Sequence, residues 1–312
     1  MHPAPAQAAP VATPVARAAA PALPLLLAPA ARIGFIGAGR LGKALAWRLH
    51  DAGLKVVAAA SATPASAQAL AARIPGCVAM AAQSVVDQSD LVFLTTPDRA
   101  IAATTSALRW RSGMAAVHCS GVTEVSALDA ARAQGAATGG FHPMQTFGDP
   151  AAAAASLPGC TITIEAGEPL NPLLVALAER IDCRVNRLPP GMRGRYHAAA
   201  GFTSQFINAL FAEAVQVWQS WGAGEADALR ALLPLAHGTL ASIASAGIAR
   251  GMPGPVSRGD VSSVEKHVAA LTPLGGDTMA FYRLMCGRTI TLAEQRGTLD
   301  AAVAERLRAA LA

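Results

Sequence analysis

The apolar positions of the chain follow two alternating patterns between residues 32 and 188. Short apolar runs typical of buried parallel strands occupy 33–36, 54–60, 91–94, 115–118, 160–164 and 184–188. Helical spacing of apolar residues occupies 41–49, 64–73, 84–87 and 171–180. This alternation predicts an α/β Rossmann domain with a doubly wound, mainly parallel sheet over residues 32–188.

The pattern changes after Pro189-Pro190-Gly191, where strand-like runs cease. Helical periodicity then covers 196–221, 225–249, 262–271 and 277–311, and it predicts an all-α C-terminal domain over residues 189–312. Ser262 and Glu265 have the spacing of a capping box, so a helix is expected to begin there.

Residues 1–31 are rich in alanine and proline and sustain neither periodicity. We interpret them as a disordered tail. A signal peptide is the less favoured interpretation, because prolines interrupt the apolar stretch that follows Arg17.

A glycine fingerprint joins the first strand to the first helix. Its first glycine suits a tight turn, its second lets the backbone approach a pyrophosphate, and its third lets the helix pack closely on the sheet. The helix N-terminus then faces the phosphate charge. The expected phosphate-binding residues are Gly37, Ala38, Gly39, Arg40, Leu41 and Gly42.

The second strand ends without a carboxylate that would bind the ribose hydroxyls of NAD. Ser61 and Thr63 stand there instead, and Arg40 or Arg73 would supply a cation for a 2′-phosphate. We therefore expect NADP as the cofactor, with NAD as the alternative.

Small polar residues follow two further strands, where ligands of open α/β sheets bind. The segments are Thr95-Thr96-Pro97 and Ser120-Gly121. We expect both segments to line the nicotinamide half of the cofactor site.

Composition and charge limit the classes of partner that the chain is expected to bind. The 312-residue chain has a formal charge of +5, and its basic residues are scattered, which disfavours nucleic acid and suits phosphate or carboxylate ligands. After the tail, no segment approaches the roughly 18 uninterrupted apolar residues of a membrane span. Five cysteines without CxxC spacing favour free thiols in a reducing cytoplasm, and no residue cluster has metal-ligand spacing.

Three residues are candidates for proton transfer. His142, which precedes a proline, is expected in an extended loop near the nicotinamide, with Gln145 as a polar companion. Tyr196 and His197 begin the long helical run, and at most one of them is expected to face the substrate because neighbours on a helix point about 100° apart. The alternative is structural: a rigid turn at His142, and a domain hinge anchored by Tyr196 and His197.

Two residues of a Gly- and Pro-bounded loop are candidates for substrate binding. Arg258 would bind a substrate carboxylate or phosphate through its planar fork, and Asp260 would orient it or bind an amine. The alternative is an ion pair or helix cap that fixes the loop. His267 follows on the next helix, where a lone histidine is more often structural.

The chain resembles bacterial two-domain Rossmann proteins whose helical half is a domain of unknown function. Five blocks carry the resemblance: the glycine fingerprint, 91–98 with 118–121, 141–147, 196–200, and 254–260 with His267. The wider similarity is to the 6-phosphogluconate-dehydrogenase-like group, which includes pyrroline-5-carboxylate reductase, ketopantoate reductase and β-hydroxyacid dehydrogenases. That resemblance implies the fold, a nicotinamide cofactor and a helical domain that pairs into a homodimer.

The long helix departs from the wider group, whose members often carry a catalytic lysine there. Residues 201–206 contain no lysine, and Gln205 stands where the group prefers asparagine. The sequence thus favours an NADP-dependent oxidoreductase acting on a small anionic carbonyl, imine or hydroxy substrate bound between the domains. The alternatives are a non-catalytic NADP(H) sensor and a deazaflavin-dependent reductase.

Overall fold

The structure, a computed structural model, describes residues 31–312. Two compact units divide the chain, one reaching Ala200 and the other spanning Gly201–Ala312. The division falls within helix α8 (Arg193–Phe202), later than the 188/189 boundary that the sequence favoured. The tail predicted over 1–31 lies outside the described residues except for Ala31.

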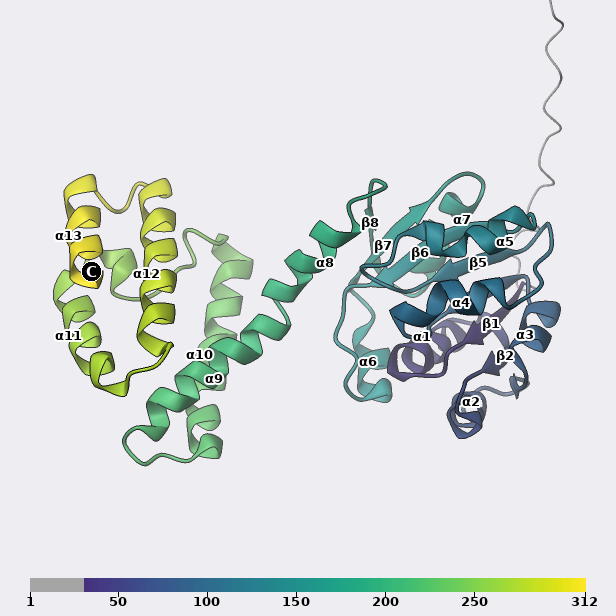
Figure 1. The fold of residues 1–312 in the computed structure, drawn as a ribbon, viewed down its shortest axis with the longest axis horizontal. Helices are drawn as coiled ribbons and strands as arrows, with labels where there is room; N and C mark the ends of the chain where they lie inside the picture. Colours follow the sequence, from purple (N-terminus) through teal and green to yellow (C-terminus); the bar gives the residue numbers. More distant parts are fainter. Residues whose placement is uncertain (1–30) are drawn as a thin grey trace, which may run out of the picture. The chain divides into compact units, whose positions relative to one another are not determined.

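The first unit is built on one eight-stranded sheet with the order β3-β2-β1-β4-β5-β6-β7-β8 (Figure 1). Every neighbouring pair is parallel except β6 and β7. This topology confirms the doubly wound, mainly parallel sheet. The strands are β1 (Arg32–Ile36), β2 (Lys55–Ala60), β3 (Val78–Ala79), β4 (Leu91–Leu94), β5 (Ala115–His118), β6 (Ala137–Pro143), β7 (Thr161–Ala166) and β8 (Arg184–Arg187).

Helices cover both faces of the sheet. One buried cluster joins the sheet to α1, α2 and α7, and the other joins it to α3, α4, η2 and α5. The elements are α1 (Arg40–Asp51), α2 (Pro64–Ala71), α3 (Ala82–Gln88), η1 (Asp98–Ala100), α4 (Ile101–Ser106), η2 (Val125–Leu128), α5 (Asp129–Ala133), α6 (Pro150–Ser156) and α7 (Leu170–Arg180).

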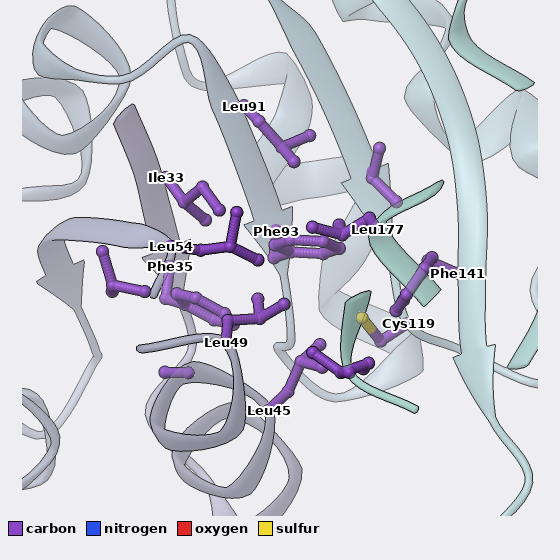
Figure 2. Close-up of a cluster of buried hydrophobic side chains, with 14 of the residues drawn as sticks. Ile33, Phe35, Leu45, Leu49, Leu54, Leu91, Phe93, Cys119, Phe141 and Leu177 are labelled. Carbon is purple, nitrogen blue, oxygen red and sulfur yellow. The ribbon is translucent and has the colours of Figure 1, made fainter. Parts of the chain in front are cut away.

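The larger buried cluster centres on three aromatic rings (Figure 2). The ring centroids of Phe35 and Phe93 lie 5.3 Å apart, and those of Phe93 and Phe141 lie 5.5 Å apart. These rings hold β1, β4 and β6 to one packed layer, and aromatic pairs at this spacing contribute beyond the area they bury. The positions of the strand ends, where a ligand would bind, are therefore set by a rigid core.

The structure corrects the expected loop at His142. This residue belongs to strand β6, where it pairs with Thr163 of the antiparallel strand β7. Gly139 and Gly140 weaken the strand signal in the sequence, but pairing on both sides keeps β6 extended. The expectation of extended backbone before the proline was right, and the loop was wrong.

The second unit is helical, in agreement with the predicted all-α domain. Two of its boundaries differ from the sequence pattern. The run over 196–221 is broken after Phe202, near Gly201 and hydroxyl residues that favour helix ends, and the run over 277–311 is broken at Gly297, whose φ is 71°. The elements are α9 (Gln205–Gln219), α10 (Glu225–Ala246), η3 (Val256–Arg258), α11 (Val261–Leu271), η4 (Thr272–Leu274), α12 (Thr278–Gln295) and α13 (Ala301–Leu311).

The buried core of the helical unit is built by η3, α11, α12 and α13, and it includes Val264, Ile290 and Leu307. Val215 and Ala228 are the buried residues that α9 and α10 possess. This helix pair therefore leaves most of its apolar surface uncovered. None of the helices between residues 31 and 312 has the length and hydropathy to cross a membrane.

Candidate cofactor and proton-transfer site

The glycine turn after β1 fits tightly against the end of β4. Gly37 has a φ of +106°, and a Cβ there would lie 2.5 Å from the backbone carbon of Thr95 and the backbone nitrogen of Thr96. The Thr95 hydroxyl donates a 2.5 Å hydrogen bond to the Gly37 carbonyl. A Cβ at Gly42 would overlap that carbonyl oxygen, whereas Gly39, which precedes α1, has open space around it. Only glycine fits the turn at residue 37, and the backbone at residue 39 stays accessible.

A cavity of about 400 Å³ opens beside this turn, at the N-terminus of α1. It contains most of the residues that the sequence assigned to the cofactor. Its lining comprises Gly37, Ala38, Gly39, Arg40, Leu41, Ser61, Ala62, Ser66, Thr95, Thr96, Pro97, Asp98, Cys119 and Ser120. Gly42 and Gly121 pack behind it, and Thr63 is exposed next to Ala62 but is not part of the lining.

One arginine and one aspartate line the cavity. Arg40 is exposed in the first turn of α1, and that turn holds no acidic residue. Arg73 lies elsewhere: its guanidinium carbon is 4.6 Å from the centroid of the Trp47 ring, and a nitrogen is 3.9 Å from the Asp51 carboxylate. Arg40 is therefore the arginine that lines the cavity. Asp98, the one acid in the lining, follows β4 rather than β2.

A row of polar residues occupies one face of the sheet at its β5 to β7 strands. The register pairs His118 with Gly140, Gly140 with Glu165, and His142 with Thr163. Directly paired residues project from the same face, and so do residues two apart on one strand. His118, His142, Thr163 and Glu165 therefore share a face with Gly140, and side chains from the start of helix α8 reach this face.

The closest contact on this face joins His142 to Tyr196. The His142 Nδ1 and the Tyr196 hydroxyl oxygen lie 2.6 Å apart, with the rings edge to face. The His197 ring centroid lies 6.3 Å from that of His142. Both neighbours on α8 thus lie beside His142, and the expectation that at most one of them faces the substrate stays a prediction.

This ring cluster adjoins the cavity through the turn after β5. A Cβ at Gly121 would lie 2.6 Å from the His197 Cδ2 and 2.9 Å from the His142 Nε2. The preceding residue, Ser120, lines the cavity. The glycine is required for the rings to approach the cavity wall this closely. The proposed proton donors and the phosphate turn therefore belong to one region of the first unit.

Burial keeps the site's acid and base groups uncharged at neutral pH. Desolvation lowers the pKa of His142 to about 4, the positive fields of His197 and Arg193 add to this effect, and Asp98 opposes it. Burial likewise lowers the pKa of His118 to about 3. Burial raises the pKa of Tyr196, while a hydrogen bond from Thr163 and the charge of Arg193 oppose the rise. His142 and Tyr196 therefore form a neutral imidazole and phenol pair.

Sequence reasoning missed Arg193 and Glu165. The Arg193 side chain is fully buried; its Nε donates to the Glu165 carboxylate at 2.6 Å and its Nη1 donates to the Ser120 carbonyl at 2.7 Å. A charged residue after a loop is normally solvent-exposed, so its identity gave no signal of burial. Two adjacent glycines inside a strand were the one available sign that another group approaches β6.

Other predicted residues lie away from this cluster. Gln145 bonds to the Ser156 carbonyl and to the backbone nitrogen of Thr146. In the helical unit, Asp260 caps α11 by accepting from the backbone nitrogen of Ser263 at 3.0 Å, so the expected cap at Ser262 is wrong.

Arg258 is exposed in η3, and the His267 Nδ1 lies 2.8 Å from the Tyr282 hydroxyl. Within residues 31–312, no group of three or more His, Cys, Asp or Glu side chains is placed to hold a metal ion.

Comparison with known proteins finds two family models that match separate segments of the chain. Residues 32–118 match the family "NADP oxidoreductase coenzyme F420-dependent", and residues 160–289 match the domain of unknown function DUF2520. Each match covers less than half of the chain, and together they place a segment similar to NADP oxidoreductases before a domain of unknown function. The first match covers the glycine turn and the ends of β2, β4 and β5, and the second covers Arg193, Tyr196 and His197. No curated protein sequence matches the chain significantly.

Solved structures share this two-domain fold at low sequence identity. A protein from Thermotoga maritima is 23% identical with a TM-score of 0.67, and the match covers 85% of this chain and 99% of that one. A reductive aminase from Aspergillus terreus, in complex with NADPH and ethyl-5-oxohexanoate, is 18% identical with a TM-score of 0.61, covering 89% and 98%. A pyrroline carboxylate reductase from Plasmodium falciparum, with NADP bound, is 11% identical with a TM-score of 0.54, covering 91% and 99%.

The lowered histidine pKa predicts how stability depends on pH. In the unfolded chain His142 takes up a proton below its ordinary pKa of 6.5, but in the native protein it does so only near pH 4. Unfolding therefore binds a proton between these values, and the free energy of unfolding falls as the pH drops from 6.5 to 4. We expect the His142→Gln variant to lose part of this fall in urea titrations at several pH values. His267→Gln, at an exposed histidine, is the matched control, and equal pH slopes for the wild type and His142→Gln would contradict the prediction.

Proposed function

We propose that the protein is an NADP-dependent oxidoreductase in which Tyr196 and His142 handle the proton that accompanies hydride transfer. The observation that carries the proposal is the 2.6 Å contact between these two side chains beside the cavity of the glycine turn. Oxidoreductases that reduce a C=O or C=N bond need a proton donor close to the cofactor. The family match at residues 32–118 supports the class of reaction.

The cavity residues fit a dinucleotide phosphate. The open backbone at Gly39 and the N-terminus of α1 favour an anion, and the turn at Gly37 leaves no side chain in its way. Arg40, Ser61 and Ser66 would hold the 2′-phosphate, while Thr95, Thr96, Pro97 and Ser120 would lie along the nicotinamide half. When bound, NADPH supplies the hydride.

The proton is supplied by the phenol and steered by the imidazole. In the tautomer that carries hydrogen on Nδ1, neutral His142 donates to the Tyr196 oxygen, which leaves the phenolic hydrogen free for the substrate. After that hydrogen leaves, the tyrosinate is stabilised by the same imidazole N–H and by the positive field of Arg193. The couple thus replaces the lysine that the wider group often uses and that residues 201–206 lack.

We propose the substrate class from an exposed arginine of the helical unit. Arg258 is exposed at the end of η3, and its guanidinium would bind the carboxylate or phosphate of a small carbonyl, imine or hydroxy compound. Asp260 is engaged as a helix cap, which leaves its proposed role as support of the loop that presents Arg258. Five free thiols suit a reducing compartment, and we propose the cytoplasm.

Turnover tests the chemistry directly. NADPH oxidation measured at 340 nm against a panel of small keto acids, ketones and cyclic imines should reveal a substrate. Tyr196→Phe should then lower kcat roughly 10²- to 10⁴-fold, because one general acid is removed, with the Kd of NADPH unchanged. Tyr282→Phe, which removes the other tyrosine, is the control and should keep full activity. Tight NADPH binding without turnover across the panel would instead favour the sensor alternative.

Cofactor preference tests the 2′-phosphate assignment. Calorimetry should show tighter binding of NADPH than of NADH. Arg40→Ala should weaken NADPH binding roughly 10- to 100-fold, the loss of one charge-assisted contact, and leave NADH binding unchanged. Arg73→Ala is the matched control because that arginine stacks on Trp47. Equal affinities for NADH and NADPH in the wild type would contradict the assignment.

A deazaflavin is the second candidate cofactor, because the matched family is described as coenzyme F420-dependent. A thermal-shift comparison of NADH, NADPH and a deazaflavin separates the alternatives. The largest stabilisation by the deazaflavin alone would move the proposed reaction to that cofactor.

We also propose a homodimer formed through α9 and α10. An apolar groove of about 450 Å³ runs between these helices, and Leu233, Leu235 and Leu240 are each between 43% and 66% exposed along α10. A continuous apolar face of this kind marks an interaction site. A second copy of the chain offers an equally apolar and uncharged face, as a two-fold contact requires.

A charge on this face should dissociate the dimer. We expect Leu235→Glu to behave as a monomer in sedimentation equilibrium at micromolar concentration, because the carboxylate would be buried without a partner. Leu284→Glu, at an exposed apolar position on α12, is the control and should leave the mass unchanged. Sedimentation of the wild type as a monomer would contradict the proposed homodimer.

A further inference from the structure

Arg193 is the one permanently charged side chain buried among residues 31–312, with no exposed surface. Arginine does not lose its proton in proteins, so its charge is retained inside the first unit. Its partner Glu165 is largely buried as well, with 12% of its side chain exposed. Burying such a pair costs desolvation free energy that the attraction barely offsets, so stability alone does not explain it.

The guanidinium joins three strands of the sheet to the first residue of α8. Nε binds Glu165 on β7, and Nη1 binds the carbonyl of Ser120, which follows β5. Nη2 lies over Gly140 on β6, where any Cβ would overlap it. The fork geometry of arginine allows Nε and Nη1 to reach these two separate acceptors at once, which a single ammonium would not match.

Helical spacing then carries the constraint to the ring cluster. Tyr196 and His197 lie three and four residues after Arg193, and residues at these spacings share one face of a helix. The face that Arg193 fixes against the sheet is therefore the face that presents Tyr196 to His142. Gly121 and Gly140, on two different segments, reserve the space that this packing needs.

We propose that Arg193 is a positioning residue that ties the start of α8 to the sheet so that Tyr196 and His142 share a proton, and that its charge assists proton release from Tyr196. This inference rests on the proposed role of Tyr196 as proton donor. Glu165 sets the strength of the effect, because its carboxylate offsets the arginine charge.

The charged and titratable groups around Tyr196 and His142 come from five segments. Arg193 is the permanent cation among them, and it therefore decides the sign of the local field together with Glu165. These groups are His118 on β5, Asp98 on η1, Cys160 before β7, Glu165 on β7, and Arg193 and His197 on α8.

The two tyrosines of the chain make the effect measurable. In a Tyr282→Phe background, the absorbance of tyrosinate at 295 nm during alkaline titration reports Tyr196 alone. We expect Arg193→Met to raise the ionisation midpoint of Tyr196 by roughly one pH unit or more, because a nearby positive charge is lost. We expect Glu165→Gln to lower it, because the arginine charge is no longer offset, and Arg193→Lys to lie closer to the parent than Arg193→Met.

Opposite shifts from the two substitutions distinguish an electrostatic positioning role from simple loss of packing, which moves both midpoints the same way. Circular dichroism verifies that each variant is folded. If Arg193→Met does not fold, the direction in which Glu165→Gln shifts the Tyr196 midpoint tests the inference on its own. An unchanged or raised midpoint in Glu165→Gln overturns the inference.

The titration needs neither cofactor nor substrate. If the two variants shift the Tyr196 midpoint in opposite directions but the protein does not oxidise NADPH, the role of Arg193 is supported and the proposed function is contradicted. If the Tyr196 midpoint does not shift but the protein does oxidise NADPH, the role of Arg193 is contradicted and the proposed function is supported. In an active protein, Arg193→Met should also lower kcat with little change in the Kd of NADPH.

Discussion

A permanent charge enclosed within the sheet and α8 is the constraint on which the candidate site depends. The Arg193 guanidinium must find acceptors wherever it is buried, and the structure provides Glu165 and the Ser120 carbonyl at 2.6 and 2.7 Å. Glu165 is available because β7 runs antiparallel to β6 in a register that places Glu165 opposite Gly140. The one strand reversal of the sheet thus determines where α8 can begin.

The cofactor half and the proton half of the site arise in different ways. The cavity at the glycine turn is made by short segments that each follow a parallel strand, together with a helix N-terminus. The ring cluster is made by strand β6 and helix α8, which are 54 residues apart at the contact of His142 with Tyr196. Ser120 belongs to both, since it lines the cavity and accepts from Arg193.

This difference explains how much the sequence predicted. The doubly wound sheet and the turn at Gly37 followed from local spacing, because a βα turn is specified by residues a few positions apart. His142 and Tyr196 were singled out as residues, but their contact depends on strand register, which the sequence pattern did not determine. Arg193 and Glu165 escaped prediction because a buried ion pair looks like two surface charges until the strands are aligned. The helix break after Phe202 was not predicted, because apolar residues keep their helical spacing on both sides of it.

Gly140 has a consequence for how this site can change over generations. A methyl group at that position would occupy the volume of the Arg193 guanidinium, so alanine and arginine cannot coexist at the two positions. A shorter residue at 193, in turn, would leave Glu165 charged and unpaired next to an empty space. Each single replacement is therefore expected to lower stability, so the two residues constrain one another across 53 positions of sequence.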